Sequence, residues 1–192
     1  QRCRVTPNTL LQAAWALLLS QYSGRREVLY GVTVAGRPAE LPGVEHILGL
    51  FINSLPLRVD IAPQTRVEDF LRALFQKNLE LRQYEHTSLL QIQSWLGLPH
   101  NRPLFESLLV FENAPIDPAL LDGRRGLDIR YRHSRTHTNY PITVVVIPGP
   151  ALHLQITYQR ERFSAVAVER MLGHFRRLLE AMIRRPQARL SE

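Results

Sequence analysis

Apolar residues recur along the first part of the chain at the spacing of an α-helix. After Thr6 and Pro7 they continue in this way as far as Tyr22, and Gly24 follows. Threonine is a favourable helix cap, proline is tolerated in the first helical turn, and glycine is typical just after the last turn. Because the apolar arc is wide, we expect this helix to be buried on more than one side.

Three more helices are predicted further along the chain. The segment Thr65–Glu68 has the form of a capping box and opens an amphipathic helix that continues to about Tyr84. A short helix is expected from about Ser88 to Leu96, ending at Gly97. Ser164 can cap a long final helix to about Ile183.

Strand patterns lie between these helices, and the order of elements predicts an α/β fold with a mixed sheet packed by long helices. Pro56 has no N–H to donate, so its strand is expected at a sheet edge or at a bulge. A short polar strand is also expected over Leu127–His133. The apolar strands are predicted at Val28–Ala35, Leu50–Ile61, Ser107–Glu112 and Ile142–Ile147, followed by alternation from Leu152 to Tyr158.

Length and composition fit one globular domain. The chain has 192 residues, of which 45% are hydrophobic and 21% charged. No apolar run approaches the roughly 18–20 residues that cross a bilayer, and no signal or lipidation motif is recognised. The single cysteine, Cys3, excludes an internal disulfide and a multi-cysteine zinc site. We therefore expect a soluble, cytoplasmic domain that does not bind membranes.

The net charge of +7 raises the question of nucleic-acid binding. All but one of the 24 basic residues are arginine, the exception being Lys77, and they are spread over the whole chain. Proteins that bind nucleic acid tend to gather basic residues on one face and to interleave them with aromatic residues. We therefore expect no nucleic-acid partner, and a basic non-enzymatic interaction module is the least favoured function.

No common catalytic or phosphate-binding motif occurs in the chain. His133 and His137 are four residues apart, but in a strand or loop this spacing does not bring two metal ligands together. We expect no metal site. By spacing alone, the sequence indicates an α/β domain without a self-contained active site.

The segment 31–59 is more specific. Gly49, Phe51, Ile52, Asn53, Ser54 and Arg58 match the G-x-F-[VI]-N-[TS]-x-x-x-R signature of condensation domains of nonribosomal peptide synthetases, which the chain strongly resembles. Ala35–Pro38 before the signature also fits. Further similar segments extend over nearly the whole chain, and they are residues 6–24, 84–95, 103–113, 138–146 and the final helix.

The resemblance implies a fold like that of chloramphenicol acetyltransferase, with two similar subdomains arranged in a V. The family's catalytic H-H-x-x-x-D-G belongs to the N-terminal subdomain, and this chain contains no His-His pair. We therefore expect residues 1–185 to be the C-terminal subdomain alone. Within it, residues 113–136 resemble a crossover to the missing subdomain. Without that subdomain, we expect these residues to be mobile, displaced or paired with a neighbouring molecule. Residues 186–192 would begin a linker to an adenylation domain.

The resemblance also implies a reaction. Two peptidyl carrier proteins present a donor acyl group and an acceptor aminoacyl group on phosphopantetheine arms, and the acceptor amine attacks the donor thioester to form an amide. No cofactor is expected to bind this chain directly, and without the histidine motif the chain is expected to be inactive alone. The alternative is half of another CoA- or carrier-dependent acyltransferase of the same superfamily.

The resemblance gives candidate site residues but no catalytic residue in this chain. Asn53 is expected as a polar group beside the substrate tunnel, or else bonded to backbone near Pro56. Ser54 is a second tunnel candidate, and in a regular strand it points to the opposite face. Arg37 and Arg58 are expected to form structural ion pairs. Gly49 and Phe51 are structural members of the motif.

Overall fold

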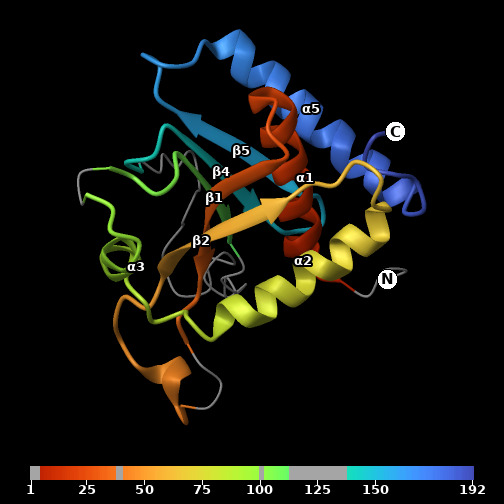
Figure 1. The fold of residues 1–192 in the computed structure, drawn as a ribbon. Helices are drawn as coiled ribbons and strands as arrows, with labels where there is room; N and C mark the ends of the chain where they lie inside the picture. Colours follow the sequence, from red (N-terminus) through yellow and green to blue (C-terminus); the bar gives the residue numbers. More distant parts are fainter. Residues whose placement is uncertain (1–4, 38–40, 100–101, 113–137) are drawn as a thin grey trace, which may run out of the picture.

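The computed structural model describes residues 5–37, 41–99, 102–112 and 138–192. Its five-stranded sheet has the order β2-β1-β3-β4-β5 (Figure 1). The outer pairings, β1 with β2 and β4 with β5, are antiparallel and cover more residues than the two inner, parallel pairings. This confirms the predicted mixed sheet, while the strand expected at Leu127–His133 lies outside the described residues. The strands are β1 (Glu27–Val34), β2 (Asn53–Asp60), β3 (Ser107–Phe111), β4 (Ile142–Ile147) and β5 (His153–Tyr158).

The predicted helices are present, and two of them begin at the predicted caps, Thr6 and Ser164. The Thr6 hydroxyl accepts from the Thr9 N–H at 3.3 Å, and Ser88 and Ser164 cap their helices in the same way. Gly24 ends the first helix with a φ of 68°. The helices are α1 (Pro7–Ser23), α2 (Val67–Arg82), α3 (Leu89–Trp95) and α5 (Ala165–Arg184), and a short 3₁₀ turn, η1, spans Val44–His46.

One hydrophobic core joins α1, α2 and α5 to a face of the sheet (Figure 1). Trp15 of α1 and Phe175 of α5 are fully buried, and their rings meet edge to face with centroids 5.7 Å apart. The Trp15 indole N–H donates to the Ser107 hydroxyl of β3 at 3.3 Å. Helix α1 is therefore enclosed between two helices and the sheet, as its wide apolar arc predicted.

The strand β2 lies at the edge of the sheet, as Pro56 indicated, but it starts at Asn53 and not at the predicted Leu50. Residues 47–52, here called the apolar loop, are not paired in the sheet. Leu48 and Leu50 are 98% and 91% exposed, and Ile52 is also exposed. The alternation that predicted a longer strand belongs instead to a loop whose apolar side chains face outward.

The capping box predicted at Thr65–Glu68 is wrong. The N-cap of α2 is Arg66, and it makes no side-chain capping bond. The first helical N–H groups, of Val67 and Glu68, donate instead to the carbonyls of Ala188 and Pro186 at 2.9 Å. The C-terminal residues thus satisfy a helix end that a side chain was expected to satisfy.

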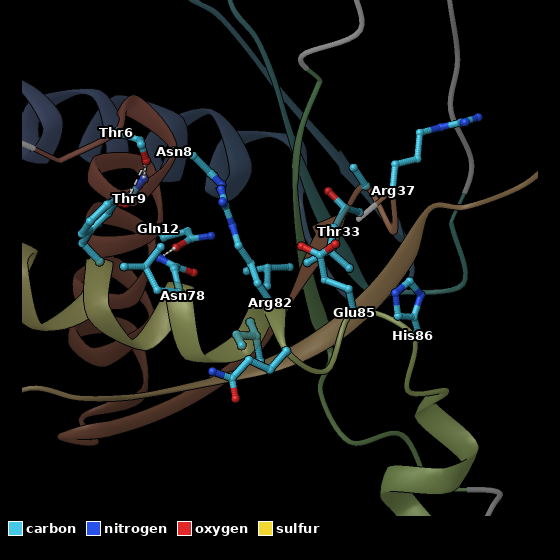
Figure 2. Close-up of a pocket in the computed structure, with 17 residues that line it drawn as sticks. Thr6, Asn8, Thr9, Gln12, Thr33, Arg37, Asn78, Arg82, Glu85 and His86 are labelled. Atoms are coloured by element: carbon cyan, nitrogen blue, oxygen red, sulfur yellow. Dashed lines mark hydrogen bonds between the residues drawn. The ribbon is translucent and has the colours of Figure 1, made fainter. Parts of the chain in front are cut away.

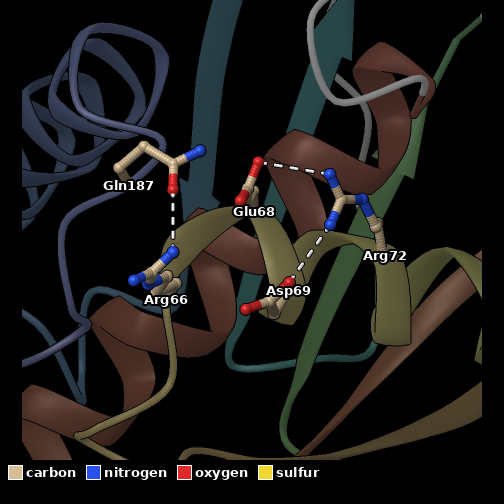
Figure 3. A network of polar contacts seen from close by, with 5 residues as sticks. All are labelled: Arg66, Glu68, Asp69, Arg72 and Gln187. Carbon is tan, nitrogen blue, oxygen red and sulfur yellow. Dashed lines mark hydrogen bonds and ion pairs between the residues drawn. The ribbon is translucent and has the colours of Figure 1, made fainter.

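The same C-terminal segment, residues 186–191, runs antiparallel to the chain that enters α2. Leu190 N–H donates to Thr65 O at 3.0 Å, and Ser191 N–H donates to Pro63 O at 3.1 Å. Figure 3 shows Arg66 reaching Gln187 beside the ion pairs that Arg72 makes on the first turn of α2. This segment was predicted to begin a linker, and in the structure it is held against the domain.

Candidate substrate cleft

A cleft of about 810 Å³ opens where α1 begins, β1 ends and α2 finishes. Figure 2 shows side chains from these elements and from the turn after α2 arranged around it. The apolar part of the lining includes Val32, Val34 and Phe75, and the remainder is largely polar. A cleft with this mixture can hold an extended chain that has both methylene groups and amides.

The floor of the cleft holds a buried polar network. Gln12 is only 2% exposed, and its side-chain oxygen accepts from Asn78 Nδ2 of α2 at 2.6 Å. Its backbone carbonyl accepts from the Tyr30 hydroxyl of β1 at 2.8 Å. Burial raises the pKa of Tyr30 well above its usual value, so this phenol stays protonated and keeps donating. The network therefore ties α1, α2 and β1 together at the cleft.

One buried oxygen in the cleft lacks a donor. Asn8 Oδ1 is buried and has no hydrogen-bond partner among the described residues. Figure 2 shows the Arg82 side chain extending along the cleft toward Asn8. A buried acceptor without a donor is unfavourable by about 1–3 kcal/mol.

Asn53 and Ser54 begin the strand next to the cleft. In the β1–β2 register they lie opposite Val34 and Thr33, and both of those β1 residues line the cleft. Asn53 bonds backbone, as one of the two expectations held. Its Oδ1 accepts from the N–H of Ser54, two residues before Pro56, and its Nδ2 donates to the more distant carbonyls of Glu85 and Thr87. Sequence reasoning could not find these carbonyls, because they lie more than 30 positions away.

Arg37 also lines the cleft. It does not form the predicted ion pair with any described residue. Its guanidinium donates to the carbonyls of Val44 and Ile47 and lies 4.2 Å from the centre of the Phe51 ring. Gly36, with a φ of 61°, packs so closely on Phe51 that an added Cβ would lie 2.0 Å from its carbonyl oxygen. These contacts connect Gly36 and Arg37 with Ile47 and Phe51 of the apolar loop, and they fix the shape of the loop.

Arg58 does have acidic partners, as predicted. Its guanidinium lies 2.5 Å from the Glu27 carboxylate of β1 and 4.0 Å from Asp60. The hydrogen bond and charge of Glu27, with a smaller effect from Asp60, raise the pKa of Arg58. The group is exposed at the edge of the sheet, so we assign it a minor structural role.

Sequence reasoning missed Asn8, Gln12 and Asn78. A signal was present, because Asn8 and Gln12 are one helical turn apart and interrupt a strongly apolar helix. Polar residues at positions where burial is expected point to an internal network or to a site.

The described part of the chain contains no group of three metal-ligating side chains, and His133 and His137 lie outside it. In that same part, no helix is both long enough and apolar enough to cross a membrane.

Comparison with known proteins gives the family. The family model for the condensation domain matches residues 1–192. A linear gramicidin synthase of Brevibacillus parabrevis is 43% identical over 189 residues, which are 98% of this chain and 2% of that protein. Chondramide synthase cmdD of Chondromyces crocatus is 41% identical over 187 residues, 97% of this chain and 5% of that protein. The chain therefore spans only a few per cent of these curated relatives.

Solved structures agree on the fold. The crystal structure of CT superposes with a TM-score of 0.86 at 25% identity and covers 97% of this chain and 43% of the CT chain. Holo-AB3403, a four-domain nonribosomal peptide synthetase bound to AMP and glycine, gives a TM-score of 0.85 at 16% identity over 97% of this chain and 15% of that one. The fold is that of a mixed α/β domain of the chloramphenicol acetyltransferase type. The chain belongs to the condensation-domain family of nonribosomal peptide synthetases.

Proposed function

We propose that this chain is the C-terminal half of a domain that joins a donor acyl group to an acceptor aminoacyl group. The observation that carries the proposal is the family match over the whole chain, together with coverage of only 43% of the matched CT chain. Residues 1–185 are the C-terminal subdomain, residues 113–136 cross to the other half, and residues 186–192 lead toward an adenylation domain. The protein acts in the cytoplasm.

In the proposed reaction, the acceptor amine attacks the donor thioester carbonyl, the carbon–sulfur bond breaks, and an amide and a thiol result. The group that takes the amine proton is a histidine of the H-H-x-x-x-D-G motif, which is absent from this chain. This half contributes one wall of the tunnel that receives the phosphopantetheine arms of two carrier proteins. Its role is to position the reacting groups and to keep water out.

The cleft supports this role chemically. A pantetheine or peptidyl chain carries amide groups, and the polar side chains of the lining, among them Thr33, Asn78 and Glu85, offer hydrogen-bond partners for them. The apolar walls fit the methylene groups between the amides. In this proposal Asn53 and Ser54 stand beside the tunnel, because their β1 neighbours, Val34 and Thr33, line the cleft although they themselves do not.

The apolar loop supports the need for a second half. Leu48 and Leu50 are almost fully exposed on a segment that Arg37 and Phe51 hold in shape. Contiguous exposed leucines indicate an interaction surface. We assign this surface to the N-terminal subdomain.

The test is reconstitution. The 192-residue chain is combined with a polypeptide that carries the H-H-x-x-x-D-G half, and with acyl-loaded donor and aminoacyl-loaded acceptor carrier proteins. Mass spectrometry of the acceptor carrier is expected to show the amide product only when both halves are present. Product from this chain alone, or no product from two halves that associate stably, would contradict the proposal.

A further inference from the structure

The side chain of Asn53 joins two distant parts of the fold. Its Nδ2 group donates to Glu85 O at 2.9 Å and to Thr87 O at 2.8 Å, and its Oδ1 accepts from the Ser54 N–H at 2.8 Å. Both amide protons and one oxygen lone pair are therefore used inside the chain. Little hydrogen-bonding capacity is left for a substrate.

The turn between α2 and α3 receives these bonds. Within it, Glu85 N–H donates to Arg82 O at 3.2 Å and Thr87 N–H donates to Tyr84 O at 2.9 Å, so these backbone bonds are all local. Local bonds fix the shape of a turn but not its place on the domain. The two bonds from Asn53 attach the turn to the first residue of β2.

The attached turn forms part of the cleft. Glu85 and His86 line it on the side opposite Asn8, as Figure 2 shows, whereas Asn53 is absent from the lining that the described residues provide. We infer that Asn53 is a positioning residue that sets where Glu85 and His86 stand in the cleft. Its effect on substrate passes through the turn and not through its own contact with substrate. The inference rests on the proposed function.

Two readouts test the inference. In the intact condensation protein containing this chain, Asn53→Ala is expected to raise the KM for the aminoacyl-loaded acceptor carrier about tenfold, with a much smaller change in kcat. In the 192-residue chain, the Glu85 and Thr87 amides are expected to exchange with solvent faster, while exchange in the α1 core is unchanged. A loss of folded protein alone would lower the rate and leave KM unchanged.

A double-mutant cycle separates positioning from direct contact. In a Glu85→Ala/His86→Ala background, adding Asn53→Ala is expected to change KM less than twofold, because the side chains that it positions are gone. A full tenfold effect in that background would overturn the inference in favour of direct contact. Asp60→Asn, an exposed change at the far end of β2, is the matched control and is expected to leave KM unchanged.

Asn53→Asp provides a second variant should the alanine protein fail to fold. It keeps an oxygen for the Ser54 N–H but replaces the two N–H donors with a carboxylate facing two carbonyls, so KM is expected to rise at least as much. Unchanged exchange at Glu85 and Thr87 in a folded variant would overturn the inference without any activity measurement. If the wild-type protein forms no amide, the proposed function fails, and exchange still decides whether Asn53 holds the turn.

Discussion

Leucines have opposite surroundings in two regions of this molecule. In α1, Leu11, Leu17 and Leu18 are buried between two helices and a sheet, whereas Leu48 and Leu50 in the apolar loop are almost wholly exposed. Both segments are ordered by contacts within the chain. The core therefore closes on residues of the described chain, while the apolar loop takes its shape here and, by our proposal, is buried by another half.

The largest effect on stability is expected from the helix side of the core. Phe175 is fully buried against Trp15, so Phe175→Ala is expected to lower the free energy of unfolding by about 3–5 kcal/mol. Urea denaturation followed by far-ultraviolet circular dichroism measures it. A loss below about 1 kcal/mol would mean that the core is not closed as described.

A smaller effect is expected inside the sheet. A Cβ added at Gly31 would lie 2.2 Å from the Phe105 ring, so Gly31→Ala is expected to destabilise the fold by about 1–3 kcal/mol. The control is Gly173→Ala in the middle of α5, where nothing lies within 4 Å of the added atom. It is expected to stabilise by about 0.5–1 kcal/mol. Equal effects in thermal melts of the two variants would refute this packing.

Tyr30→Phe tests the polar floor of the cleft. It removes the hydroxyl that donates to Gln12 O and is expected to cost about 1 kcal/mol. Because burial raises the pKa of Tyr30, its contribution is complete below pH 10.0 and declines as pH rises from there toward the folded value. The stability gap between wild type and variant is therefore expected to narrow in alkaline denaturation series. A constant gap would argue against a buried phenol.

The smallest effect on stability is expected in the apolar loop. Leu48→Ser/Leu50→Ser changes side chains that are already in water, so the unfolding free energy of the chain is expected to change by less than about 0.5 kcal/mol. Binding to the H-H-x-x-x-D-G half, measured by calorimetry, is expected to weaken at least tenfold. Unweakened binding would break the proposed link between this loop and the second half.

Most of the element order could be predicted because it depends on local chemistry. Thr6, Ser88 and Ser164 cap helices within three residues of their own position. At Thr65 the same local logic failed, because the N–H groups at the start of α2 donate to backbone carbonyls 118 and 121 positions away. A sequence pattern records which helix end needs a partner but not which distant segment supplies it.

The site was less predictable than the fold, for the same physical reason. The family resemblance marked Arg37 and Asn53 as important, but it did not reveal their partners, which are carbonyls and an aromatic ring. Every residue has a backbone carbonyl, so neither composition nor the spacing of residue types indicates which carbonyl will accept a hydrogen bond. The expected crossover at residues 113–136 lies outside the described residues and stays a prediction.

The antiparallel backbone pairing between residues 186–191 and 63–68 has a mechanical consequence. A pulling force applied at Glu192 would act first on the backbone hydrogen bonds between residues 186–191 and 63–68, and only afterwards on the C-terminal end of α5. These hydrogen bonds would break one after another. A force at Glu192 would therefore act on α2, whose other end borders the cleft. Tension at the C-terminus would then be transmitted along α2 to the cleft.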